Sequence, residues 1–182
     1  MNNTLSTSTK KIYCFDTSAF VTLSRTSENI INIPEELWNH LDEMVKDGGI
    51  ISHRTVFEEI VSKSKKPDLV SAWLLDKEKY FRNKTQFQID TVLKIISNFP
   101  DLIDSESEHE QADPWIIALA IEKTGEDPLF GEKKVAVVSQ ENKRSTKKMP
   151  AVCEFFRTEH LSLRDFFQEI GLGIKLIKNK EE

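Results

Sequence analysis

The sequence predicts one α/β domain built on a central, mainly parallel β-sheet. Two observations carry this prediction. Short apolar runs typical of buried strands alternate along the chain with stretches whose apolar residues recur at helical spacing. The first of these runs also leads directly into residues that favour the start of a helix, as in the first half of a βαβ unit. Strands that alternate with helices in this way are typical of α/β folds with a parallel sheet.

The N-terminal half alternates between strand and helix signals. Residues 11–15 form an apolar run that is too short for a helix and ends at Asp16-Thr17-Ser18, three residue types found at helix N-caps. Residues 34–45 carry proline and acids in the first turn and apolar side chains at three- and four-residue spacing, which predicts a helix. Residues 50–52 then predict a strand, and residues 56–61 predict a helix that carries two adjacent acids.

The C-terminal half continues the alternation. Helical stretches are predicted over residues 69–77 and 87–99, and residues 111–122 are apolar enough for a buried helix. Residues 135–139 are rich in β-branched valine and apolar up to the final Ser139, as central strands of parallel sheets tend to be. Residues 162–165 have the pattern of a capping box and predict the start of a last helix.

Length and composition favour a single globular domain. The chain has 182 residues, 38% of them apolar and 30% charged, and no internal linker or repeat divides it. We expect a flexible polar tail over residues 1–10, the domain over residues 11–172 and a second polar tail over residues 173–182. Twenty-five basic and 30 acidic residues give a net charge of −5, which disfavours a protein that coats duplex DNA by bulk charge.

The chain shows no sign of a secreted or membrane protein. No apolar run approaches the ~20 residues that a transmembrane helix needs, and the polar start lacks the apolar region of a signal peptide. Cys14 and Cys153 lie in apolar surroundings without the spacing of a zinc site, so a disulfide scaffold is not expected. The predicted location is the cytoplasm.

Acidic residues fall at informative positions relative to the predicted elements. Asp16 follows the first strand and Glu141 follows the strand at 135–139, and ligands of parallel α/β sheets bind beyond such strand ends. Asp113 begins a buried helix, and Glu58 or Glu59 lies early in the helix after the second strand. Carboxylates that gather in one place repel each other unless a cation neutralises them, and oxygen ligands suit Mg²⁺ or Mn²⁺.

Each acid also has a purely structural interpretation. Asp113 before Pro114 has the pattern of a helix N-cap, and Asp16 could cap the helix that follows it. Glu58 and Glu59 could form a solvated helix face, and Glu141 could belong to an ordinary loop. The four histidines lack metal-ligand spacing and are interpreted as surface or structural residues: His40, His53, His109 and His160.

Four ordered stretches, at 12–18, 56–60, 112–118 and 137–141, resemble the signature stretches of the PIN-domain nucleases, which include the VapC-type toxins. Residues 99–104 and 148–153 add a narrower resemblance to the bacterial PIN-like group called domain of unknown function 4411. The resemblance spans roughly residues 11–167. It implies a PIN-like three-layer α/β/α sandwich and a metal-dependent ribonuclease that uses Mg²⁺ or Mn²⁺.

The resemblance also implies a set of site residues. Glu59 is preferred to Glu58 because the acid of the family directly precedes an aliphatic residue, here Ile60. The last acid is Glu141 where many members have aspartate, so direct and water-mediated metal contact both stay open. The implied catalytic and metal-binding acids are Asp16, Glu59, Asp113 and Glu141, and the supporting polar residues are Thr17, Ser18 and Ser139.

A basic stretch and several partners complete the expectations. Residues 142–149 carry four cations and no acid, which predicts contacts with RNA phosphates or, alternatively, a solvated loop: Lys143, Arg144, Lys147 and Lys148. The resemblance further implies an RNA substrate, a cognate antitoxin of a type II toxin–antitoxin system and a homodimer. No membrane partner is expected.

Two rival interpretations are of different classes. An aspartate after the first strand could accept phosphate, as in receiver domains and haloacid-dehalogenase-type phosphatases. However, Ser18 stands where the phosphatase needs a second acid, and Cys14 and Phe15 stand where the receiver needs paired acids. The second rival is a non-catalytic PIN-like scaffold that binds RNA or a protein.

Overall fold

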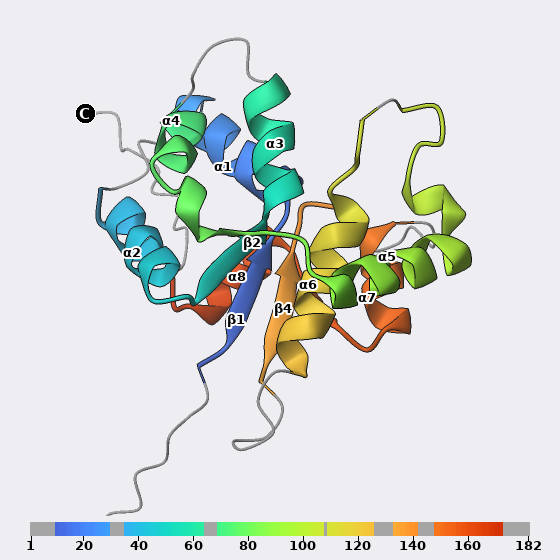
Figure 1. Cartoon of the computed structure of the whole chain (residues 1–182). Helices are drawn as coiled ribbons and strands as arrows, with labels where there is room; N and C mark the ends of the chain where they lie inside the picture. Colours follow the sequence, from blue (N-terminus) through green and yellow to red (C-terminus); the bar gives the residue numbers. More distant parts are fainter. Residues whose placement is uncertain are drawn as a thin grey trace, which may run out of the picture.

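The chain folds around a parallel β-sheet (Figure 1). The computed structural model describes residues 10–29, 35–63, 69–107, 109–125, 133–141 and 148–172. Within these ranges the sheet has five strands in the order β3-β2-β1-β4-β5, and every pairing is parallel. The strands are β1 (Ile12–Phe15), β2 (Ile50–His53), β3 (Phe81–Arg82), β4 (Val135–Val138) and β5 (Glu159–Leu161). The predicted α/β fold with a mainly parallel sheet is confirmed.

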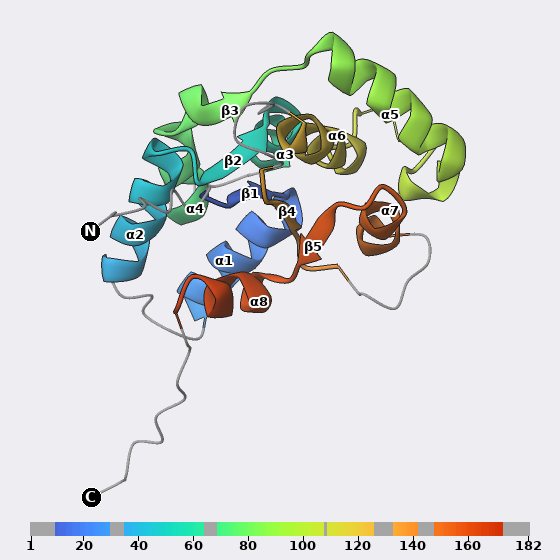
Figure 2. The same ribbon diagram turned by 90° about the horizontal axis from the view of Figure 1, so that it is seen from below.

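Helices connect the strands and cover both faces of the sheet (Figure 2). The α-helices are α1 (Thr17–Asn29), α2 (Glu35–Lys46), α3 (Arg54–Lys63), α4 (Leu69–Leu75), α5 (Gln86–Asn98), α6 (Asp113–Thr124), α7 (Met149–Phe155) and α8 (Leu163–Glu169). Two 3₁₀ helices are η1 (Glu78–Tyr80) and η2 (Pro100–Leu102). The capping box predicted before α8 is present, with Ser162 and Asp165 bonding to each other's backbone N–H.

Two strands and one α-helix of the described ranges were not predicted from the sequence. β3 has two residues and β5 has three, so neither shows a readable strand alternation. α7 has seven residues, about two turns. The helix predicted over 69–77 is also shorter than expected, because α4 ends at Leu75 and a turn leads into η1.

The side chains of β1 alternate between the two helical layers. The rings of Tyr13 and Phe15 each lie 4.9 Å from the ring of Phe166 in α8. On β2, His53 stacks on Trp115 of α6 on the other side of the sheet, at a ring-centroid distance of 5.2 Å. Figure 2 shows α1 and α8 on one side of the sheet and α5 and α6 on the other. Because successive strand residues point to opposite faces, Asp16 faces the α6 layer.

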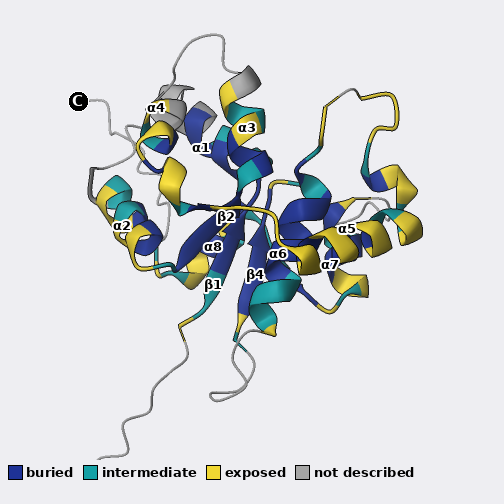
Figure 3. Cartoon of the chain, viewed as in Figure 1, coloured by how far each residue is buried: buried dark blue, intermediate teal, exposed yellow. Residues whose placement is uncertain are grey.

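The buried core runs through the sheet and α6 (Figure 3). Residues 114–120 of α6 are buried without interruption, and Val137 of β4 is completely covered. Such a helix is stable only when its whole surface is packed, and α6 packs across β1, β2 and β4. The packing fixes α6 on the sheet, so its first residue, Asp113, is held near the carboxyl ends of the central strands.

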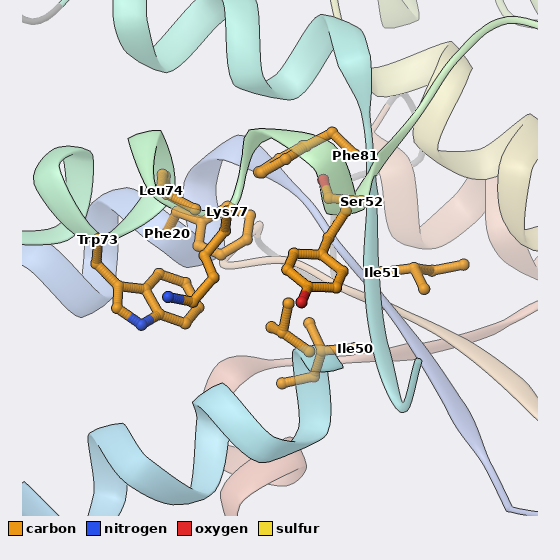
Figure 4. A pocket seen from close by; sticks show the side chains of 10 residues that line it. Phe20, Ile50, Ile51, Ser52, Trp73, Leu74, Lys77 and Phe81 are labelled. Carbon is orange, nitrogen blue, oxygen red and sulfur yellow. The ribbon is translucent and has the colours of Figure 1, made fainter. Parts of the chain in front are cut away.

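A small, partly open pocket lies beside α4 (Figure 4). Its volume of about 20 Å³ is room for a single water. The Nζ atom of Lys77 lies 5.4 Å from the ring of Trp73 and pairs with the carboxylates of Asp42 at 2.8 Å and Asp76 at 2.7 Å. These contacts give Lys77 a structural role that ties α4 to α2. Throughout the described ranges, no helix combines the length and apolar character of a membrane crossing.

Candidate metal-binding site

Asp16 both caps a helix and keeps one carboxylate oxygen unused. The residue follows β1 and is only 2% exposed. Its Oδ2 accepts hydrogen bonds from the backbone N–H of Ser18 at 3.0 Å and from the Ser18 hydroxyl at 2.6 Å, which satisfies the start of α1. Its Oδ1 is buried and has no hydrogen-bond partner within the described ranges. Burial raises the pKa of Asp16, the Ser18 bonds oppose that rise, and the charge of Glu59 adds to it.

Asp113 is the first helical residue of α6, and the cap position belongs to Ala112. The interpretation of Asp113 as an N-cap is therefore wrong, because Pro114 occupies the second helical position instead of the first. Burial raises the pKa of Asp113 well above its usual value, and the negative charges of the other three acids raise it further. Lys148 opposes the rise only weakly. Hydrogen bonds link Asp113 to the other acids, because Glu59 contacts both Ala112, next to Asp113, and Thr17, next to Asp16.

Glu59 reaches the cluster from α3 and connects two helix starts. Its Oε2 accepts a hydrogen bond from the Thr17 hydroxyl at 2.8 Å, and its Oε1 accepts one from the backbone N–H of Ala112 at 3.0 Å. Glu58 points elsewhere: its side chain is 57% exposed and pairs with Arg54 at 3.2 Å. The structure thus places Glu59, and not Glu58, with the other acids.

Glu141 approaches the cluster from the segment after β4. Its Oε2 accepts a hydrogen bond from the backbone N–H of Met149 at 2.8 Å, at the start of α7. Its Oε1 lies 3.9 Å from the Nζ atom of Lys148, which is a loose ion pair. The side chain is 18% exposed. Glu141 is therefore fixed between β4 and α7, and its negative charge raises the pKa of Asp113.

Hydroxyl groups hold the backbone that carries Glu141. The Ser18 hydroxyl, while it donates to Asp16, accepts a hydrogen bond from the backbone N–H of Gln140 at 2.9 Å. The buried Ser139 hydroxyl bonds to Nε2 of His160 at 2.7 Å and accepts the N–H of Glu141 at 3.4 Å. His160 lies in β5 and was not predicted as part of the site, because no spacing in the sequence connects it to Ser139.

The donor set suits a hard divalent cation. Across the described ranges, no three acidic, histidine or cysteine side chains are already arranged as ligands of one ion. The reason is visible in the hydrogen bonds, because Glu59 and Glu141 direct oxygens at N–H and O–H donors. Asp16 Oδ1 and the Asp113 carboxylate are left, and Mg²⁺ is usually held by one or two carboxylates and several waters. The residues present therefore fit such an ion.

The predicted basic stretch is only partly visible. Lys143, Arg144 and Lys147 lie outside the described residues. Lys148 is described, and its side chain is 50% exposed beside Glu141.

The fold and this cluster define a parallel α/β domain with an acidic site at the carboxyl ends of its central strands. Residues 13–174 match the family described as "Domain of unknown function (DUF4411)", and the chain belongs to this family, as the sequence resemblance predicted. No curated protein matches the chain. Among solved structures, the chain is similar to one described as "Crystal structure of VapBC2 from Rickettsia felis bound to a DNA fragment from their promoter". The sequence identity is 19% and the TM-score is 0.47. That match covers 83% of this chain and 98% of the other chain.

Proposed function

We propose that the protein is a Mg²⁺- or Mn²⁺-dependent ribonuclease that hydrolyses RNA phosphodiester bonds. The observation that carries the proposal is that hydrogen bonds connect the four segments that carry the acids, one of which has a buried and unbonded oxygen: Asp16, Glu59, Asp113 and Glu141. Like charges that are buried together are unfavourable unless a cation balances them. A divalent ion between them resolves that cost.

The four acids divide into two roles in this proposal. Asp16 and Asp113 would hold the ion. Asp16 has a buried carboxylate oxygen without a hydrogen-bond donor, and the carboxylate of Asp113 is buried beside three other negative charges. Glu59 and Glu141 would orient water around it, since hydrogen bonds already fix their carboxylates. When bound, the ion would polarise a phosphoryl oxygen and lower the pKa of a water molecule.

The remaining contacts support the site by fixing its dimensions. Glu59 bridges Thr17 at the start of α1 and Ala112 at the start of α6, so the positions of Asp16 and Asp113 are set relative to each other. Such preorganisation lowers the cost of assembling the reacting groups. The clustered negative charge would also repel RNA phosphates until a cation neutralises it, so RNA binding at this site should depend on the metal.

The biological role that we propose is that of a toxin in a type II toxin–antitoxin system. The sequence resemblance to VapC-type toxins supports this role. With the role we propose a cytoplasmic location, a cognate antitoxin and a homodimer. A non-catalytic PIN-like scaffold that binds RNA or a protein is the second candidate. The observation in its favour is that no three of the described side chains are already arranged as ligands of one ion.

Incubation of labelled RNA with the protein and Mn²⁺, with and without EDTA, tests the proposal. We expect cleavage that EDTA abolishes. Asp16→Asn should lower the cleavage rate by more than about 100-fold, which exceeds the effect of losing a partner outside the first ligand shell. RNA that is bound but not cut would support the scaffold. Phosphorylation of Asp16 by acetyl phosphate would support the rival phosphate-accepting class.

A further inference from the structure

One arginine lies in the same row of the sheet as the acidic site. The strand register pairs Cys14 with Ile51 and pairs His53 with Arg82. If the register of β1 and β2 is continued, Phe15 lies beside Ser52, and the next residue of each segment places Asp16 beside His53. Arg82, His53 and Asp16 therefore form a row across β3, β2 and β1 at the carboxyl ends of these strands.

The row also determines which face these side chains occupy. Neighbours in one row of a sheet point to the same face. His53 stacks on Trp115 of α6, so Arg82 and Asp16 point toward the α6 layer as well. Adjacent strands lie about 4.8 Å apart, so the backbone of Arg82 is about 10 Å from that of Asp16. β3 is an edge strand, and Arg82 is exposed.

The charge of Arg82 is available to a ligand. Within the described ranges it makes no ion pair and no side-chain hydrogen bond, whereas its neighbours are paired. Arg54 pairs with two glutamates, and Lys84 pairs with Glu110 at 2.6 Å. A guanidinium matches the geometry of a phosphate and can donate two parallel hydrogen bonds to it.

We propose that Arg82 binds a backbone phosphate of the RNA on the β3 side of the acidic site. Lys148, half-exposed beside Glu141, lies on the opposite flank. The RNA strand would then cross the sheet edge from α7, over Asp16, toward β3. This inference rests on the proposed function, because the position of the scissile bond comes from the acidic cluster.

Salt dependence of RNA binding tests the contact. Each phosphate contact to a single strand contributes about 0.7 to the slope of log affinity against log salt concentration. In the Glu59→Gln background, which keeps Asp16 and Asp113 for Mn²⁺ but should cleave slowly, we expect Arg82→Ala to flatten the slope for a labelled oligouridylate by about 0.7. Raising the salt concentration from about 50 to 200 mM weakens RNA binding by both proteins. The fold-loss of affinity should be about 2.6 times smaller for the Arg82→Ala protein than for the parent. Arg82→Lys should restore part of the slope.

Arg164→Ala is the matched control. Arg164 is exposed on α8, on the opposite face of the sheet, and its replacement should leave the slope unchanged. Thermal unfolding of each variant checks that the fold is intact. If the wild-type protein cleaves the oligouridylate while Arg82→Ala keeps the parent slope, the inference is wrong and the proposed function stands. If the wild-type protein does not cleave but Arg82→Ala still flattens the slope, the contact stands and the hydrolase does not. Absence of RNA binding by every variant overturns both.

Discussion

Stabilisation by Mn²⁺ is the most direct consequence of the acidic cluster. An ion that binds the folded chain and not the unfolded chain raises the free energy of unfolding by RT ln(1 + [L]/Kd). At a Mn²⁺ concentration of about 100 times Kd this amounts to about 2.7 kcal/mol. For a domain of this length, each kcal/mol moves the unfolding temperature by about 2–4 °C, so we expect a rise of about 5–11 °C.

The substitution Asp113→Asn should remove this response. The amide keeps the shape of the side chain but removes a charge that lies beside Asp16, Glu59 and Glu141. Differential scanning calorimetry with and without Mn²⁺ measures the shift. Asp90→Asn is the control, because Asp90 is exposed on α5 and accepts only a surface hydrogen bond from Gln86. A Mn²⁺ shift in Asp113→Asn equal to that of the wild type would refute the assignment.

The pH dependence of stability gives an independent check. The pKa of Asp113 is higher in the folded chain than in the unfolded chain, so the folded state keeps a proton that the unfolded state releases. Without metal, stability should therefore fall as pH rises from the unfolded pKa of about 3.9 through the raised folded value. Asp113→Asn should show a smaller fall, because only the raised pKa of Asp16 then contributes to it, and should be more stable than the wild type at neutral pH. With Mn²⁺ the trend should reverse, because the ion needs deprotonated ligands.

Two further variants test the residues around the two aspartates. Glu59→Gln should lower Mn²⁺-dependent cleavage by about 10–100-fold, as expected for a partner outside the first ligand shell. Glu58→Gln removes only an exposed ion pair, worth less than about 1 kcal/mol, and should leave the rate unchanged; equal losses in the two variants would contradict the geometry. His160→Leu should cost about 0.5–1.5 kcal/mol of stability, because the buried Ser139 hydroxyl loses its short bond to His160 and keeps only the long one from the N–H of Glu141. His160→Leu should also lower kcat with little change in KM, and His160→Gln should restore kcat. His40→Leu is the control, because His40 is exposed on α2, and should leave kcat unchanged.

Much of the architecture was predictable because it follows from local patterns. The apolar runs at β1, β2 and β4 are long enough to read as buried strands, and the spacing of apolar residues in α2 and α5 predicts their helices. β3 and β5 were missed because two or three residues do not show an alternation, and α7 because its seven residues begin without a capping side chain. They form only because the longer elements provide surfaces on which they pack.

The sequence by itself determined that acids would follow the ends of strands in an α/β fold, and hence which edge of the sheet would be acidic. The tertiary structure placed Glu59 beside Ala112 and Glu58 on the surface, and it gave the cap position of α6 to Ala112. It also brought His160 and Arg82 to the same edge. The physical reason is that strand ends and helix starts are set by neighbouring residues. Which side chains meet across a sheet depends on strand order and register, and these are settled only when distant segments pack together.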